Sequence, residues 1–394
     1  MSVLTTHLPD LAEHVLPADA HEATLIGRVH DPGEGPCVVA VRGDTAVDLT
    51  PLTPTASDLL DRDDRLELAR RAPATRTWPV RELIAASLTE RPDAAHLLAP
   101  VDLQVLKAAG VTFVRSMLER VIEERAGGDR ARAREVRARL VEVVGGAVSS
   151  VRPGTEQARR VKEVLQQEGL WSQYLEVGIG PDPEIFTKAP VLSAVGTGAR
   201  IGVLERSTWN NPEPEMVLVA DSAGRAVAAT LGNDVNLRDF EGRSALLLTE
   251  AKDNNASCAI GPFLRLFDER FSLEDAAGVD IRLTVTGRDG FTLEGISSVS
   301  QISRTPGELL SHAYGPHHRY PDGFVLFTGT MFAPTEDRGV PGQGFTHQVG
   351  DVVTISSARL GMLVNTVDTA EAAPDWTVGI RALMRNLAGR GLLG

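Results

Sequence analysis

Short apolar runs separated by glycine and proline turns dominate the chain from about residue 171 onward. Clear examples are 216–220 (MVLVA), 226–231 (AVAATL), 281–286 (IRLTVT) and 352–356 (VVTIS). Runs of this length, bounded by turn residues, are typical of β-strands. Few long helical patterns lie between them, so the sequence favours an α+β fold with a sandwich or rolled sheet over a series of alternating βαβ units.

The first 95 residues form a separate pattern, which predicts a small N-terminal domain over 1–95. Residues 24–49 read as short strands between Gly/Pro turns, and 57–71 (SDLLDRDDRLELARR) reads as helical. The segment also holds four histidines without the spacing of a metal site, which we expect to lie at the surface: His7, His14, His21 and His30.

A strongly helical block opens the second unit, which we place at 96–394. Two apolar faces recur at helical spacing; they consist of Val114, Leu118, Val121 and Ile122, and of Val136, Leu140, Val143 and Val144. The block predicts a helical insertion over about 114–170. An arginine-rich run at 130–139 has Glu119 and Glu123 nearby, so we expect a solvated, salt-bridged helix face and not a nucleic-acid patch.

Composition and charge narrow the functional classes. The chain has 394 residues, 42% of them hydrophobic, and a net charge of −13. Such an acidic balance argues against nucleic-acid binding, which needs a basic surface. Two distant cysteines, Cys37 and Cys258, make neither a disulfide framework nor a zinc site. No apolar run is long enough to span a membrane and the N-terminus lacks signal-peptide features, so we expect a soluble cytoplasmic protein without membrane partners.

One glycine-rich motif resembles a nucleotide loop but lacks its context. Residues 196–202 (GTGARIG) would need a strand before them and a helix opening at the last glycines. The residues that follow, IGVLE, read as a strand. We therefore expect no dinucleotide cofactor.

Paired carboxylates at 213 and 215 are the strongest chemical feature. Glu213 and Glu215 flank Pro214 at the start of an apolar strand, so their side chains leave the same face. Asp234 follows two predicted strands later, in LGNDVNLRDFEGR. Three carboxylates of this kind suit Mg²⁺, Mn²⁺ or Ca²⁺. From spacing alone, an exposed strand end and an ordinary turn aspartate would explain the same residues.

The order of several motifs resembles the fumarylacetoacetate hydrolase superfamily. These are PDPEIFTK at 181–188, NNPEPEMVLV at 210–219, GNDVNLRDFEGR at 232–243, KDNNASCAIGPF at 252–263, FTGTMFAP at 327–334 and GQGFTHQVGDVVTISSARLGMLVN at 342–365. The family pattern has a Phe-x-Lys segment, a Glu-x-Glu strand, an Asn-Asp-x-x-x-Arg-Asp segment and a lysine before a Gly-Pro. The resemblance covers 96–394 and implies a mixed β-roll catalytic domain behind a smaller N-terminal domain, in homodimers or homotetramers.

Other segments are similar to the 2-keto-3-deoxy-pentonate dehydratase branch of this family, which serves oxidative pentose degradation. They are LWSQYLEVGIGPDPEIFTK, DFEGRSALLLTEAKDNNASCAIGPF, AYGPHHRYPDGF and RNLAGRGLL. The resemblance implies Mg²⁺-dependent dehydration (Mn²⁺ being an alternative) of 2-keto-3-deoxy-D-xylonate, a small anionic keto acid, to 2,5-dioxopentanoate. Residue by residue it implies metal ligands Glu213, Glu215 and Asp234, catalytic Lys252 and Glu184, and a substrate pocket with Lys188, Thr330, Arg238 and His317.

Two of these assignments carry further expectations. Arg238 is expected to pair with Asp239 beside the metal aspartate, and His317 to shape the substrate pocket or a subunit contact. Hydrolytic members place an aspartate and a His-Glu pair where this chain has GVTFVRSMLER at 110–120. This departure favours dehydration. An acylpyruvate or diketo-acid hydrolase or decarboxylase on the same fold, and a metal-binding protein without turnover, remain the alternatives.

Overall fold

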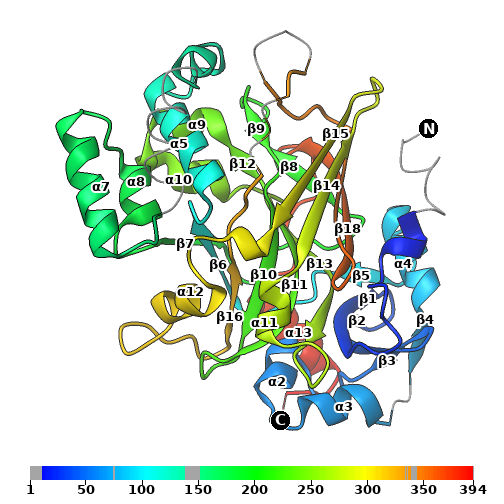
Figure 1. Ribbon diagram of the computed structural model, residues 1–394. Helices are drawn as coiled ribbons and strands as arrows, with labels where there is room; N and C mark the ends of the chain where they lie inside the picture. Colours follow the sequence, from blue (N-terminus) through cyan, green and yellow to red (C-terminus); the bar gives the residue numbers. More distant parts are fainter. Residues whose placement is uncertain are drawn as a thin grey trace.

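A long mixed sheet runs through the molecule and carries strands from both halves of the chain (Figure 1). The computed structural model describes residues 11–73, 76–137, 151–332, 334, 336–338 and 344–393. Across the sheet the order is β4 (Thr77–Pro79), β3 (Thr45–Asp48), β2 (Gly35–Arg42), β1 (Leu25–Asp31), β13 (Cys258–Leu266), β11 (Ala226–Asp234), β10 (Pro214–Ala220), β16 (Phe324–Phe327), β6 (Val105–Gly110) and β7 (Glu184–Ala189), with β5 (His96–Leu98) beside β1. The N-terminal strands extend the sheet because β1 pairs antiparallel with β13. The domain boundary at residue 95 stays a prediction.

A second sheet packs against the first and encloses the main core. Its strands in order are β15 (Thr292–Ser298), β14 (Asp280–Thr286), β17 (Val352–Ser357), β18 (Gly361–Thr369) and β8 (Arg200–Val203); β9 (Asn210–Asn211) and β12 (Asn236–Leu237) form a separate short ribbon. Met216 and Leu218 of β10 belong to the same buried cluster as Leu283 of β14 and Ile355 of β17. Because side chains alternate along a strand, Val217 and Val219 face a different buried cluster. Strand β10 is thus buried on both faces.

The helices lie around the outside of the two sheets and form two main groups (Figure 1). They are α2 (Ala56–Asp61), α3 (Arg65–Arg71), α4 (Val80–Leu88), α5 (Val114–Ala126), α7 (Glu156–Gln167), α8 (Gln173–Ile179), α9 (Arg238–Arg243), α10 (Leu248–Lys252), α11 (Leu273–Ala277), α12 (Pro306–Ala313) and α13 (Ile380–Gly389), with 3₁₀ turns at Ala245–Leu247 and Val299–Gln301. The helical stretch predicted at 57–71 is two helices, since the backbone is extended at Arg62. In the described part of the chain, no helix is long and apolar enough to cross a membrane.

The strand predictions at 216–220, 226–231, 281–286 and 352–356 are confirmed by β10, β11, β14 and β17. Among the named strands of the described residues, β16 pairs parallel with β6 and β18 with β8, and the other pairs are antiparallel. The α+β class with mixed sheets is therefore confirmed. A strand, β8, follows the glycine-rich motif as expected.

The predicted apolar face of the first helix is also confirmed. Val121 and Ile122 of α5 are buried, and Val114 and Leu118 pack against the same cluster. The second predicted face lies mostly outside the described residues, which exclude Leu140, Val143 and Val144. Among the N-terminal histidines, His14 and His21 are exposed and His30 is half-buried; His7 lies outside the described residues.

Candidate active site

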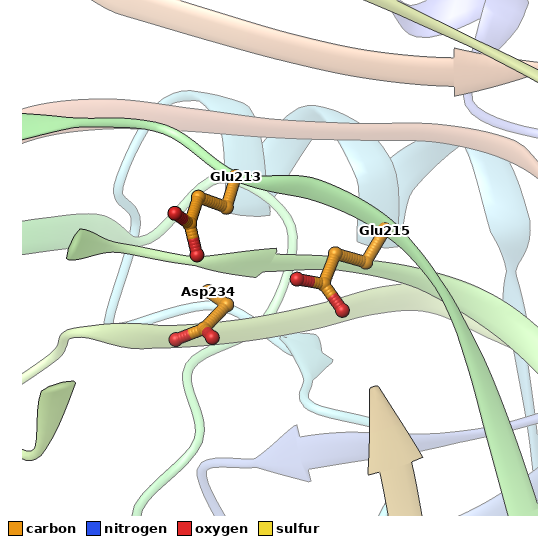
Figure 2. Close-up of side chains that lie close together, drawn as sticks. All are labelled: Glu213, Glu215 and Asp234. Carbon is orange, nitrogen blue, oxygen red and sulfur yellow. The ribbon is translucent and has the colours of Figure 1, made fainter. Parts of the chain in front are cut away.

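The three carboxylates named from the sequence converge at one end of β10 and β11. Glu213, Glu215 and Asp234 each place a carboxylate oxygen within 4.8 Å of the others, and all three side chains are buried. Figure 2 shows the carboxylates pointing into the same space, two from the β10 segment and one from the end of β11. The alternative of an exposed strand end is thereby wrong.

Local pairing explains this arrangement. Pro214 lies opposite Asn233 in the β10–β11 register, and β16 pairs with β10 only from Val217 onward, so the missing N–H of Pro214 leaves no ladder bond unmade on that side. The backbone N–H of Glu213 donates to the side-chain oxygen of Asn233 at 3.0 Å, and the N–H of Asp234 donates to the carbonyl of Glu213 at 3.0 Å. The two strand ends are locked together where the carboxylates project.

Two buried lysines contact the carboxylates. The Lys252 ammonium donates to Asp234 at 2.9 Å and to Glu213, and the Lys188 ammonium lies 2.9 Å from the other oxygen of Asp234. Lys188 also donates to the carbonyls of Val235 and Lys252. Lys188 is therefore enclosed by fixed acceptors, whereas Lys252 donates to the side chains of two members of the carboxylate triad.

Helix α5 contributes a buried arginine that the sequence did not single out. Arg120 donates to Glu213, to Glu123 at 2.6 Å and contacts Glu241 of α9 at 2.9 Å. The prediction of a solvated helix face is confirmed for the exposed Arg132 and Arg134 of the arginine-rich run. It is wrong for Glu119 and Glu123, which are 7% and 1% exposed. Removing one partner of such a buried pair costs about 3–5 kcal/mol, because the other charge is left unpaired in a low dielectric. In the sequence, polar residues interrupt the apolar face of 114–126 at three- and four-residue spacing. This pattern was the signal that could have indicated a buried ionic network.

Arg238 lies behind this arginine and serves the same ionic network. Its guanidinium contacts Glu123 at 2.6 Å and Glu119 at 3.2 Å, and stacks over Trp209. The expected pairing with Asp239 is wrong, since the Asp239 carboxylate accepts hydrogen bonds from Ser207 and Thr208 on the far side. The reason is that α9 begins at Arg238 and directs these two neighbours to different faces.

The loop after β16 closes the site from another side. Gly329 has a φ of +92°, and a Cβ there would collide with the Thr112 hydroxyl, so only glycine fits. In this conformation its N–H donates to the Glu215 carboxylate at 2.6 Å. Thr330 follows it and lines the same cavity, with its hydroxyl accepting from the N–H of Phe332 at 3.0 Å. The sequence prediction for Thr330 places it beside the triad, although its contact with a substrate stays a prediction.

Glu184 completes the cavity wall at the start of β7, opposite Gly110 of β6. Burial and the negative charge of Glu241 raise the pKa of Glu184 to about 7. Burial, together with Asp234 and Glu213, also raises the pKa of Glu215. Burial alone would lower the pKa of Lys252, but Asp234 and Glu213 outweigh it and the pKa is raised. The protein's own charges therefore keep Lys252 as an ammonium ion.

The charge balance of the cavity fits a divalent cation. Its lining residues are Ala109, Gly110, Val111, Ser116, Arg120, Glu184, Phe186, Glu213, Glu215, Asp234, Glu241, Lys252, Gly329 and Thr330. Five of them are carboxylates, and the cations in contact with these are Arg120, Lys188 and Lys252. The five carboxylates outnumber these three cations, and burial together with the neighbouring carboxylates raises the pKa values of Glu184 and Glu215. Oxygen ligands without sulfur or nitrogen suit magnesium or manganese.

His317 is not brought to this site within the chain. It lies in the turn between α12 and β16, where its ring contacts the carbonyl of His312 at 3.0 Å. The first residue of β16, Phe324, pairs with Ala220 at the end of β10 farthest from Glu215. The proposed role of His317 in the pocket therefore has no support from the geometry of a single chain.

A model of the fumarylacetoacetate (FAA) hydrolase C-terminal family matches residues 158–368. The chain belongs to this family. It is 31% identical over 327 residues to a probable 2-keto-3-deoxyxylonate dehydratase of Haloferax volcanii, covering 80% of this chain and 93% of the relative. It is 32% identical over 185 residues to the 2-dehydro-3-deoxy-D-arabinonate dehydratase of Saccharolobus solfataricus, covering 47% of this chain and 58% of that relative.

Solved structures agree on the fold. A 2-keto-3-deoxy-D-arabinonate dehydratase complexed with magnesium and 2,5-dioxopentanoate superimposes with a TM-score of 0.61 at 21% identity, covering 88% of this chain and 99% of that protein. Its apo form gives the same values. At this identity the likeness establishes the fold, and the resemblance drawn from the sequence motifs is confirmed at the level of the family.

Proposed function

We propose that the protein dehydrates 2-keto-3-deoxy-D-xylonate (the same compound as 2-keto-3-deoxy-D-arabinonate) to 2,5-dioxopentanoate. The observation that carries the proposal is the buried triad of Glu213, Glu215 and Asp234 with the Lys252 ammonium directly against it. This set is found in a chain whose curated relatives are named as dehydratases of this sugar acid.

A magnesium ion held by the triad would act as a Lewis acid toward the substrate carboxylate and C2 carbonyl, which makes the C3 protons acidic. Manganese offers the same oxygen-ligand chemistry. Lys188 keeps Asp234 ionised, because burial would otherwise raise the pKa of this carboxyl and the two lysines lower it. The N–H of Gly329 holds the Glu215 carboxylate in place through a hydrogen bond of 2.6 Å.

The protein side chains supply the proton transfers. Lys252 lies against Glu213 and Asp234, and we assign it as the proton donor to the hydroxyl that leaves from C4 as water. Glu184, with its pKa near 7, is the group able to accept the C3 proton at neutral pH. Tautomerisation of the resulting unsaturated keto acid through C5 then gives the aldehyde. Thr330, at the cavity wall, is assigned to the substrate carboxylate; Arg238 pairs with Glu123 and lines the adjoining small cavity with Thr330, and its contact with the substrate stays a prediction.

A coupled assay with racemic 2-keto-3-deoxy-pentonate tests the reaction. We expect 2,5-dioxopentanoate as the product, loss of activity in EDTA, and its return on adding Mg²⁺ or Mn²⁺. Mass spectrometry of the products separates dehydration from C–C cleavage, which would give pyruvate and glycolaldehyde from this substrate, or pyruvate and a second acid from an acylpyruvate offered in its place. Full activity after metal removal, or release of pyruvate, would contradict the proposal.

The assembly and the location are part of the same proposal. We propose a homodimer or homotetramer, as the family resemblance implies, and a location in the reducing cytoplasm, where the free Cys37 and Cys258 would stay reduced. Light scattering of the purified protein measures the number of subunits, and a monomer at assay concentration with full turnover would exclude the need for an assembly.

A further inference from the structure

Arg120 occupies a central place in the charged cluster that the proposed reaction leaves unassigned. Its side chain is almost fully buried and contacts three carboxylates from three elements: Glu123 on its own helix α5, Glu241 on α9 and Glu213 at the start of β10. A guanidinium can do this because its N–H groups project in several directions within one plane. A lysine ammonium has no such fork.

Each of the two carboxylate oxygens of Glu213 contacts a different cationic side chain. One accepts from Arg120 and the other from Lys252. Lys252 also contacts Asp234, so its partners are the metal-binding carboxylates themselves. The remaining partners of Arg120, Glu123 and Glu241, lie outside the triad and keep the guanidinium in place from the helix side. Arg120 is thus anchored independently of whatever the triad binds.

The packing of α9 against α5 makes this anchoring possible. A Cβ at Gly242 would lie only 3.0 Å from the carbonyl oxygen of Glu123, so a glycine here lets the two helices approach closely. The close approach brings Glu241 and Glu123 to the same guanidinium. Arg120 also lines both of the small cavities that meet at this point, with Ser116, Glu213 and Thr330 common to the two.

We propose that Arg120 is a positioning residue that fixes one oxygen of Glu213 and thereby directs the other into the metal site, while holding Glu241 in the cavity wall. The kinetic effects expected from this inference rest on the proposed function. The structural effects expected from it rest on the ion pairs alone. Arg120 acts through Glu213 and Glu241, so its loss lowers the turnover number more than it weakens substrate binding.

The test compares Arg120→Met with Arg137→Met. Arg137 belongs to the same ionic network, and its substitution by methionine removes the same charge. Its ion pair is with Glu119 and not with a member of the triad. For Arg120→Met we expect kcat to fall about 100-fold with the substrate KM within about threefold, as for other groups that orient metal ligands. The Mn²⁺ EPR spectrum of the loaded variant should also differ from that of the wild type. Arg137→Met should leave both measurements unchanged.

Three outcomes would overturn the proposal. A raised KM with unchanged kcat would make Arg120 a direct substrate contact. Equal losses in Arg120→Met and Arg137→Met would indicate a general effect of charge. An unchanged EPR spectrum in Arg120→Met would show that Glu213 does not depend on the arginine. The EPR comparison needs no substrate, so it decides the role of Arg120 even where the wild type fails to dehydrate the sugar acid.

A second variant covers the case in which Arg120→Met does not fold. Arg120→Lys keeps the charge but cannot reach three carboxylates at once. It should fold, show an altered Mn²⁺ EPR spectrum and retain an activity between those of the wild type and Arg120→Met. An Arg120→Lys protein indistinguishable from the wild type in spectrum and kcat would overturn the proposal on its own.

Discussion

Two cavities of this protein differ in size and in chemistry. One, of about 640 Å³, lies between the N-terminal strands, the 192–200 segment and α13. The other, of about 20 Å³, lies at the ends of β10 and β11. No residue lines both. The large cavity has the volume of a small-molecule pocket, yet the convergent carboxylates and lysines are in the small one.

The difference shows that charge, not volume, marks the proposed active site. A cavity of about 20 Å³ holds on the order of one water molecule, and the Lys252 side chain lies against Glu213 and Asp234 at its wall. A five-carbon keto acid needs more room, so we expect the lining side chains to move apart when substrate binds. The large cavity is preformed but brings no such set of groups together. Three variants test this contrast.

Glu215→Gln should have the largest effect. Loss of one charged ligand of the triad should lower kcat by about 10³-fold or more. The unfolding midpoint of the metal-free variant should be unchanged or higher, because burial and the neighbouring carboxylates already raise the pKa of Glu215 and penalise its charge. Kinetic assays and thermal unfolding measure the two effects. Retained activity would remove the small cavity from consideration as the active site.

Glu184→Gln should have the next largest effect, a fall in kcat of about 10²-fold through loss of the proton acceptor. The wild-type rate should rise with pH through an ionisation at or below about 7, since Glu184 accepts a proton only once its own is lost. This rise of the rate with pH should be absent in Glu184→Gln. A pH–rate profile measures it, and a wild-type rate that falls through the same ionisation would make Glu184 the acid instead.

Trp376→Ala should have the smallest effect. Trp376 lines the large cavity and is 47% exposed. A partly exposed side chain outside the charged site should change kcat by less than about threefold. Steady-state kinetics checks this. A loss comparable to that of Glu215→Gln would break the contrast and place the chemistry in the large cavity.

Much of the fold follows from local patterns. The strands around 216–220 and 352–356 are apolar, short and bounded by turn residues, and they formed as predicted. The 57–71 stretch is two helices because the chain becomes extended at Arg62, which the charged run from 61 to 64 did not reveal. The joining of β1 to β13 was not predictable from either segment, since it pairs residues more than 200 positions apart.

By itself, the sequence predicted the carboxylate triad and its suitability for a divalent cation. The spacing of Glu213 and Glu215 predicts that they share one face of a strand, and the family resemblance drawn from the motif order adds Asp234 and Lys252. It placed Lys188 in the substrate pocket, whereas the structure pairs this lysine with Asp234. Local geometry and motif order are properties of the chain, so they can be read without coordinates.

Only the tertiary structure revealed the ion pairs that helices α5 and α9 contribute to the site. Arg120 lies 93 residues from Glu213, and its surroundings read as an ordinary charged helix. Whether such a charge is solvated or buried depends on what packs over it, here α9 with Glu241. A buried charge must find partners to offset its lost hydration, and those partners come from elements that no local pattern connects.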